Sequence, residues 1–346
     1  MSTYIFLLSF LSTVACTEYT LNSAKDLNQA EGELEDGEIR GRICSPSGDT
    51  WLVGATAYVE VDDNHDGQID RRVEAITDGE GYFTLSGLAD GAYTIYVTKG
   101  SFSTTYEVEL QGSYTLAESS CAVEPPNIAV ITGSFDHIED ILQDLQIEHD
   151  IYVGEFGGNY QDLLLSSNQL NAYDILFLNC GIDDGWLSSE SQIQSNLRAF
   201  VEQGGSIYAS DWSHSFVESA FPEKIDFFGE DHNYIDAQVG NEGAVTADIL
   251  DDTMQTVLND EVASLNYDLS SWVMMTNTAE NVEILIQGSV EGVSWETGES
   301  EVHQDTPLAV RFTHGEGTLV FTSFHNEHQH TTLDMRALLE EMIFSL

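Results

Sequence analysis

Basic residues are scarce in this sequence: 10 Lys and Arg side chains stand against 60 Asp and Glu among 346 residues. The formal net charge of -50 repels phosphate backbones, because nucleic-acid binding depends on clusters of Lys and Arg. We therefore expect no nucleic-acid partner. The stretch 225–310 has no Lys or Arg, so its carboxylates cannot form ion pairs with such residues within it. Such acidity is typical of a solvated surface in a salty or extracellular medium. The alternative interpretation is that the carboxylates mostly bind cations.

Long hydrophobic runs are also missing, since a bilayer-spanning helix needs about 20 apolar residues. The run from Tyr4 to Ala15 is shorter and is followed directly by Cys16. It predicts a signal peptide over residues 1–15, and the small residues before Cys16 resemble the lipobox of bacterial lipoproteins. That resemblance implies a lipidated Cys16 and an exported chain anchored at the outer membrane, the cell surface or the periplasmic face. Simple secretion and an uncleaved segment are the alternatives.

Cysteine is rare, with four residues in the chain. Export permits disulfides, and Cys44 and Cys121 flank a stretch of short β-type runs, so a bridge between them would join its two ends. The sequence leaves open whether they pair. Cys180 would then be a single buried thiol, which is usually a packing residue.

Residues 16–37 are acidic and poor in apolar side chains, which predicts a tether. From 38 to 120, short β-type runs are broken by turn residues, and this spacing predicts a small all-β sandwich. The strings at 54–59, 77–83 and 87–95 resemble the carboxypeptidase regulatory-like family, a transthyretin-like or immunoglobulin-like sandwich. The resemblance implies a structural or adhesive spacer.

One loop of this region carries oxygen side chains at alternate positions around Gly67. Such ligands converge when a loop curls, and the spacing suits calcium and resembles the first nine positions of an EF-hand loop. The alternative is a metal-free hairpin turn, because Asp, Asn and Gly also favour turns. The predicted calcium ligands are Asp62, Asn64, Asp66, the backbone of Gln68, and Asp70.

The pair Pro125-Pro126 ends a linker at 121–126, because proline cannot donate to a sheet and restricts the preceding residue. Strand-like and helix-like runs alternate after it. This alternation predicts an α/β doubly wound, flavodoxin-like domain over 127–346, so that the chain is multidomain. The stretch 224–280 fits the alternation poorly and is interpreted as an insertion.

Three landmarks in this second region resemble the class I glutamine amidotransferase-like superfamily: the strings at 173–181, 209–214 and 324–327. The resemblance implies an oxyanion loop after the first, a nucleophile in the second, and a His base with its orienting Glu in the third. His325 and Glu327 match the third motif. Because ligand sites of open parallel sheets lie beyond the carboxyl ends of their strands, we expect both to face Asp211 there.

Asp211 occupies the slot of the Cys nucleophile, and a carboxylate cannot form the thioester that this route to amide hydrolysis needs. Glutaminase activity is therefore not expected. The sequence favours a non-catalytic domain that binds an unidentified protein or small-molecule ligand, or serves in assembly. The alternative is a hydrolase that uses Ser210, Ser213 or Cys180 with His325 and Glu327.

Several residues near these landmarks are of types that bind zinc, although His-rich loops are often polar surface, and zinc is not expected. This set consists of Asp211, His214, His325, Glu327, His328 and His330.

Overall fold

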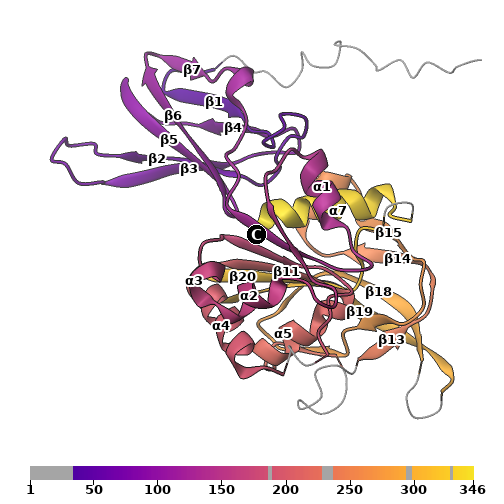
Figure 1. The fold of residues 1–346 in the computed structure, drawn as a ribbon. Helices are drawn as coiled ribbons and strands as arrows, with labels where there is room; N and C mark the ends of the chain where they lie inside the picture. The colour runs from indigo at the N-terminus through magenta and orange to yellow at the C-terminus, as the bar shows by residue number, and fades with distance from the viewer. Residues whose placement is uncertain (1–33, 186–188, 228–236, 294–297, 328–329) are drawn as a thin grey trace, which may run out of the picture.

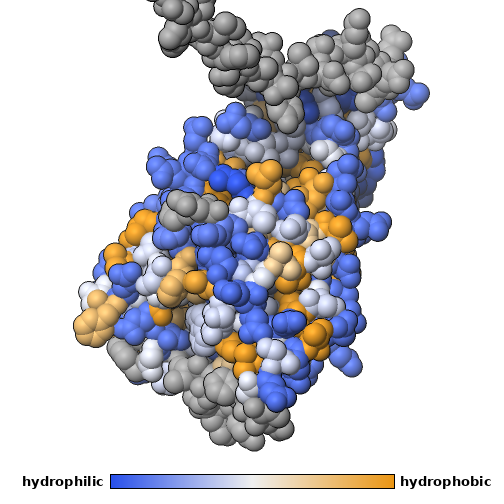
Figure 2. Space-filling model, turned by 90° about the vertical axis from the view of Figure 1, so that its right-hand side faces the viewer, coloured by the Kyte–Doolittle hydropathy of each residue, from blue (hydrophilic) through white to orange (hydrophobic). Residues whose placement is uncertain are grey.

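The computed structural model describes residues 34–185, 189–227, 237–293, 298–327 and 330–346 (Figure 1). The predicted signal peptide, Cys16, most of the predicted tether and His328 lie outside the described residues. None of the described helices has the length and apolar content needed to cross a membrane. Hydrophilic residues cover most of the face shown in Figure 2, with smaller hydrophobic areas between them.

The N-terminal strands form two sheets, of strand orders β4-β1-β7 and β3-β2-β5-β6. Buried and less buried residues alternate along β2, as expected where one strand face meets the core. Their bounds are β1 Glu38–Arg42, β2 Thr56–Val61, β3 Arg71–Ile76, β4 Tyr82–Leu85, β5 Gly91–Lys99, β6 Phe102–Leu110 and β7 Ser113–Thr115, followed by the short 3-10 helix η1 Glu118–Ser120.

The structure settles the pairing that the sequence leaves open. Cys44 and Cys121 form a disulfide with an S–S distance of 2.04 Å, and they are 77 residues apart in sequence. Cys44 follows β1 and Cys121 follows η1, so the bridge joins the start of this group of strands to the end of it. Cys180 is a buried free thiol.

The rest of the chain is built on one 11-stranded sheet, ordered β15-β14-β18-β19-β20-β11-β10-β8-β9, with β13 pairing to β18 and β16. The neighbours from β9 to β20 are parallel, and those from β20 to β15 are antiparallel. The strands are β8 Ile128–Thr132, β9 Asp150–Val153, β10 Ile175–Leu178, β11 Ser206–Ser210, β13 Gln238–Gly240, β14 Gly243–Ile249, β15 Val262–Tyr267, β16 Trp272–Met274, β18 Glu283–Val293, β19 Ser300–His314 and β20 Gly317–Thr322, with a separate pair of β12 Ile225–Asp226 and β17 Asn277–Thr278.

The predicted doubly wound, flavodoxin-like fold is wrong, because strands dominate and much of this sheet is antiparallel. A doubly wound fold would make the apolar runs at 282–287 and 308–313 separate strands of a parallel sheet. They belong instead to β18 and β19, which pair as one long antiparallel hairpin. The stretch 224–280 supplies β14 and β15, which extend the sheet beyond β18.

Helices cover both faces of the large sheet (Figure 1). One face shares a core with α1, α6, α7 and the N-terminal strands, and the other packs against α2, α3, α4 and α5. Successive residues of β8 alternate between the two cores, as the pleat of a strand requires. The helices are α1 Ile138–Asp144, α2 Tyr160–Leu165, α3 Ser167–Leu170, α4 Ser191–Glu202, the 3-10 helix η2 Asp211–Ser213, α5 His214–Ala220, α6 Asp252–Leu258 and α7 Leu333–Ser345.

The end of α7 is packed against the turn between β5 and β6. Lys99 Nζ lies 2.5 Å from Glu341 Oε1, and both side chains are buried. Gly100 has a φ of +53°, and a Cβ there would lie 2.1 Å from the carbonyl oxygen of Leu346. Only glycine fits this approach, which joins the N-terminal strands to the large sheet.

Candidate functional site at the carboxyl edge of the parallel strands

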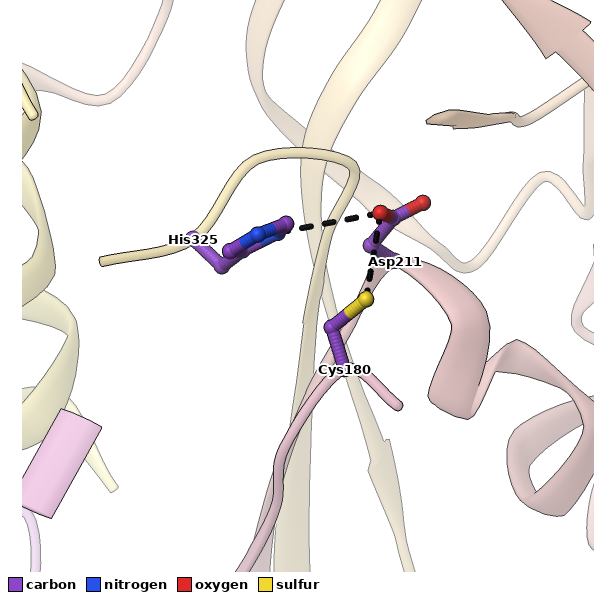
Figure 3. A group of neighbouring side chains, drawn as sticks. All are labelled: Cys180, Asp211 and His325. Carbon is purple, nitrogen blue, oxygen red and sulfur yellow. Dashed lines mark hydrogen bonds and ion pairs between the residues drawn. The ribbon is translucent and has the colours of Figure 1, made fainter. Parts of the chain in front are cut away.

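Three neighbouring parallel strands, β10, β11 and β20, end at the same edge of the large sheet. Cys180 follows β10, Asp211 follows β11, and His325 follows β20. Figure 3 shows the three side chains pointing toward one another from these separate loops. The parallel strand direction places them together, because parallel strands present all their carboxyl ends on one side.

Asp211 is the centre of this cluster. The Cys180 thiol donates to Asp211 Oδ2 at 3.3 Å, and His325 Nδ1 lies 3.7 Å from the same oxygen. On the other side of the ring, His325 Nε2 lies 2.5 Å from Glu327 Oε1. Neither ring nitrogen is aligned for a hydrogen bond with any described acceptor, so both contacts are charge pairs. The imidazole is therefore held between two carboxylates.

The turn after β11 fixes the position of Asp211. Its φ is +45°, and the Val273 amide donates to its Oδ1 at 2.6 Å. The Ser213 hydroxyl donates to the Ser210 carbonyl at 2.8 Å and accepts from the Ser210 amide. The Ser210 hydroxyl donates to Asp136 Oδ2 at 2.6 Å. Both serines are thus bonded within the turn and its surroundings, and neither hydroxyl donates to His325.

Burial and charge shift the protonation equilibria of the cluster. Burial raises the pKa of Asp211 to about 6, although the nearby His325 opposes this shift. Burial lowers the pKa of His325, but Glu327 and the other carboxylates around the ring outweigh it and hold that pKa at about 9. Burial and the adjacent Asp211 raise the pKa of the Cys180 thiol well above its usual value. At neutral pH the cluster holds an imidazolium and a protonated thiol.

A cavity of about 120 Å³ lies beside the cluster and is lined by Cys180, Asp211 and His325. Its walls are aromatic and acidic. The rings of Tyr267 and Trp272 stack with centroids 4.0 Å apart, and Trp212 also lines the space. Asp268 and Glu327 add carboxylates, and none of the described lining residues is Lys or Arg.

Of the other histidines of a zinc-binding type, His214 lies outside the cavity lining and His330 is part of it. His214 packs between the rings of Trp212 and Phe227, with centroids 5.4 and 5.1 Å away. His330 lines the cavity, with its Nε2 3.6 Å from Asp268 Oδ2.

Sequence reasoning missed two carboxylates of the site. Asp136 is fully buried in the loop after β8. Because β8 is another strand followed by polar residues, its end could have been compared with the three landmarks. Asp268 follows β15, inside the stretch interpreted as an insertion, and no motif marks it. Glu327 lies beside Asp268 and raises the pKa of that carboxyl.

The predicted calcium ligands lie in the exposed loop between β2 and β3. Asp62 Oδ2 accepts from the Gly67 amide at 2.7 Å, which holds the pKa of Asp62 below its usual value. Asn64 Oδ1 accepts from the Asp66 amide at 2.9 Å, and Asp70 Oδ2 accepts from the Asp63 amide at 2.9 Å. Backbone amides thus curl the loop around these side chains.

No known protein family and no curated protein match this sequence. Among solved structures, a cytoplasmic protein from Salmonella typhimurium matches with 11% identity over 73% of this chain and 94% of its own, at a TM-score of 0.37. A second cytoplasmic protein, from Salmonella typhimurium LT2, matches with 12% identity over 74% of this chain and 95% of its own, at a TM-score of 0.39. A β-galactosidase from Rahnella sp. R3 matches with 14% identity over 63% of this chain and 31% of its own, at a TM-score of 0.31. These similarities are too weak to assign an activity.

Proposed function

We propose that the cavity beside Asp211 binds a small cation and that the chain is a non-catalytic binding protein. The observation that carries the proposal is the orientation of Cys180 and His325, which both face carboxylates and not each other. Nucleophilic catalysis needs a nucleophile bonded to its base, with a third group orienting that base. Here a carboxylate stands between the thiol and the imidazole.

The hydrolase alternative is disfavoured for each of its three candidate nucleophiles. The Ser210 hydroxyl donates to Asp136, and the Ser213 hydroxyl donates to the Ser210 carbonyl. The Cys180 thiol donates to Asp211. None of these groups donates its proton toward His325.

The lining of the cavity supports a cationic ligand. Three carboxylates, from Asp211, Asp268 and Glu327, outnumber the single buried imidazole of His325. Aromatic rings attract cations through the negative potential above their faces, and Trp212, Tyr267 and Trp272 are among the lining residues. A cation therefore gains charge pairing in the cavity, whereas an anion is repelled.

Export and lipidation of Cys16 belong to the same proposal, and the short apolar run that ends at this residue supports them. The resemblance to amidotransferase-like proteins is likewise a proposal, supported by the meeting of the three landmark loops at one sheet edge. The proposal also includes a spacer role for the N-terminal strands and a structural calcium ion in the loop between β2 and β3. Mass spectrometry that finds a mature terminus other than diacylated Cys16 would exclude lipid anchoring.

Fluorescence of the full chain tests the cation proposal, because Trp212 and Trp272 line the cavity. Ethylammonium chloride, zinc chloride and sodium acetate are titrated at constant ionic strength. We expect a saturable change with at least one of the two cations, weakened at least tenfold by Asp268→Asn, and none with acetate. Saturable binding of acetate, or of neither cation, would contradict the proposal.

A further inference from the structure

We propose that Cys180, Asp211 and His325 together bind one thiophilic divalent metal ion of the zinc class. This inference rests on the proposed cation-binding function of the cavity and names the cation. The three side chains offer sulfur, oxygen and nitrogen donors from three separate loops, and one donor atom of each lies within 4.8 Å of the others. Figure 3 shows the convergence.

The spacing of the donors fits a tetrahedral ion. Zinc bonds of about 2.0–2.3 Å place neighbouring ligand atoms roughly 3.3–3.8 Å apart in tetrahedral geometry. The Cys180 sulfur lies 3.3 Å from Asp211 Oδ2, and His325 Nδ1 lies 3.7 Å from the same oxygen. Two of the three edges therefore already have the length that an ion at the centre requires.

An independent observation points to a missing ligand. The side chain of His325 is only 7% exposed and lines the cavity, and its Nδ1, 3.7 Å from Asp211 Oδ2, has no aligned hydrogen-bond partner. A buried polar atom without a partner is costly, and such atoms are rare in native proteins. An ion at Nδ1 would satisfy the nitrogen that faces Asp211.

Glu327 has the position of an outer-shell partner. Metal-binding imidazoles commonly direct their second ring nitrogen to a carboxylate, which fixes the ring and strengthens it as a ligand. Glu327 Oε1 lies 2.5 Å from His325 Nε2, on the side of the ring away from Asp211.

The donor set selects the metal class. A thiolate and an imidazole favour zinc and related soft or borderline ions over calcium and magnesium, which prefer oxygen ligands alone. Binding displaces the thiol proton of Cys180 and any proton on His325 Nδ1, and these protons pass to solvent. Because all three donors line the cavity, a fourth position stays open to a donor that enters it.

The test uses the full chain with Cys16→Ser and the disulfide intact, so that Cys180 is the only free thiol of the parent protein. The protein is loaded with zinc, desalted in a weak chelator and analysed for metal content. We expect one zinc per chain, lost from Cys180→Ser and His325→Gln. Glu327→Gln should weaken binding about 10–100-fold, as outer-shell substitutions do. Cobalt should give a thiolate charge-transfer band that Cys180→Ser abolishes.

The matched control is Asp62→Asn with Asp70→Asn, which removes two exposed carboxylates far from the cavity and should leave zinc retention unchanged. Glu327→Gln keeps the test valid if a ligand substitution impairs folding, because Glu327 is only partly buried. Equal zinc retention in the parent and Cys180→Ser, or cobalt binding without the thiolate band, would overturn the inference. Saturable ethylammonium binding without zinc retention would overturn the metal site alone and leave the proposed function standing.

Discussion

Two groups of carboxylates in this chain are held in opposite surroundings. In the β2–β3 loop Asp62 is exposed, and the Gly67 amide keeps its pKa below the usual value. At the sheet edge Asp211 is buried, and burial raises its pKa to about 6. The first group offers oxygen atoms alone, whereas the second lies against sulfur and nitrogen. On the proposals made above, the neighbouring donor atoms and not the carboxylate itself decide which class of cation each group would prefer, because oxygen ligands alone suit calcium whereas sulfur and nitrogen suit zinc.

The largest expected effect comes from removing the partner of a buried carboxylate. Lys99→Met leaves Glu341 unpaired where both side chains are buried, and this should lower the free energy of unfolding by about 3–5 kcal/mol. Adding Glu341→Leu should recover most of the loss, because the uncompensated charge is then gone. Denaturant unfolding of the full chain measures both.

An exposed pair is the matched control for that loss. Arg71 Nε lies 2.8 Å from Asp63 Oδ2 on the surface of the β2–β3 hairpin. Exposed pairs contribute little because water and salt screen them, so Arg71→Met should leave the unfolding midpoint nearly unchanged. Equal losses from Lys99→Met and Arg71→Met would break the distinction between buried and exposed carboxylates.

The disulfide should affect the N-terminal strands more than the sheet edge. Cys44→Ala with Cys121→Ala removes a cross-link that closes a long loop, and we expect a loss of about 2–4 kcal/mol in unfolding free energy. Reductant should destabilise the parent protein and leave this double variant unaffected. A parent protein that is indifferent to reductant would show that the two cysteines are not paired in solution.

At Asp211 two substitutions separate stability from binding. Asp211→Ala leaves the buried Val273 amide without an acceptor, which should cost about 1–3 kcal/mol. Asp211→Asn keeps an acceptor oxygen and tolerates the φ of +45°, so it should cost less. Because both remove the negative charge, both should weaken, in the fluorescence titration, the binding of whichever cation the parent protein binds. Undiminished binding in either variant would show that Asp211 does not attract the cation.

Sequence reasoning reached the three landmark loops because each follows a short buried strand whose end is marked by polar residues. It failed on the fold class because a short apolar run such as 308–313 looks the same in a parallel sheet and in an antiparallel hairpin. Which strand such a run pairs with depends on the tertiary fold, and the residues of the run do not determine it. Asp268 was missed for the same reason, since only the pairing of β14 and β15 with the sheet brings it to the cavity.

The smallest expected effect is a calcium-dependent rise in the melting temperature of the full chain. An ion that binds only the folded loop stabilises it by mass action. Asp62→Asn with Asp70→Asn should abolish the rise without changing zinc retention. If calcium leaves the melting temperature of the parent protein unchanged, the loop is a metal-free turn. The contrast between an exposed calcium site and a buried zinc site is then lost.

The central claim is that the buried cluster lacks a nucleophile bonded to its base and is therefore not catalytic. The most direct test measures ammonia release from L-glutamine by the full chain in the presence of a chelator, beside the His325→Ala variant. We expect both proteins to match the protein-free blank, because Asp211 separates the Cys180 thiol from the imidazole. Turnover by the parent protein that His325→Ala abolishes would contradict the account.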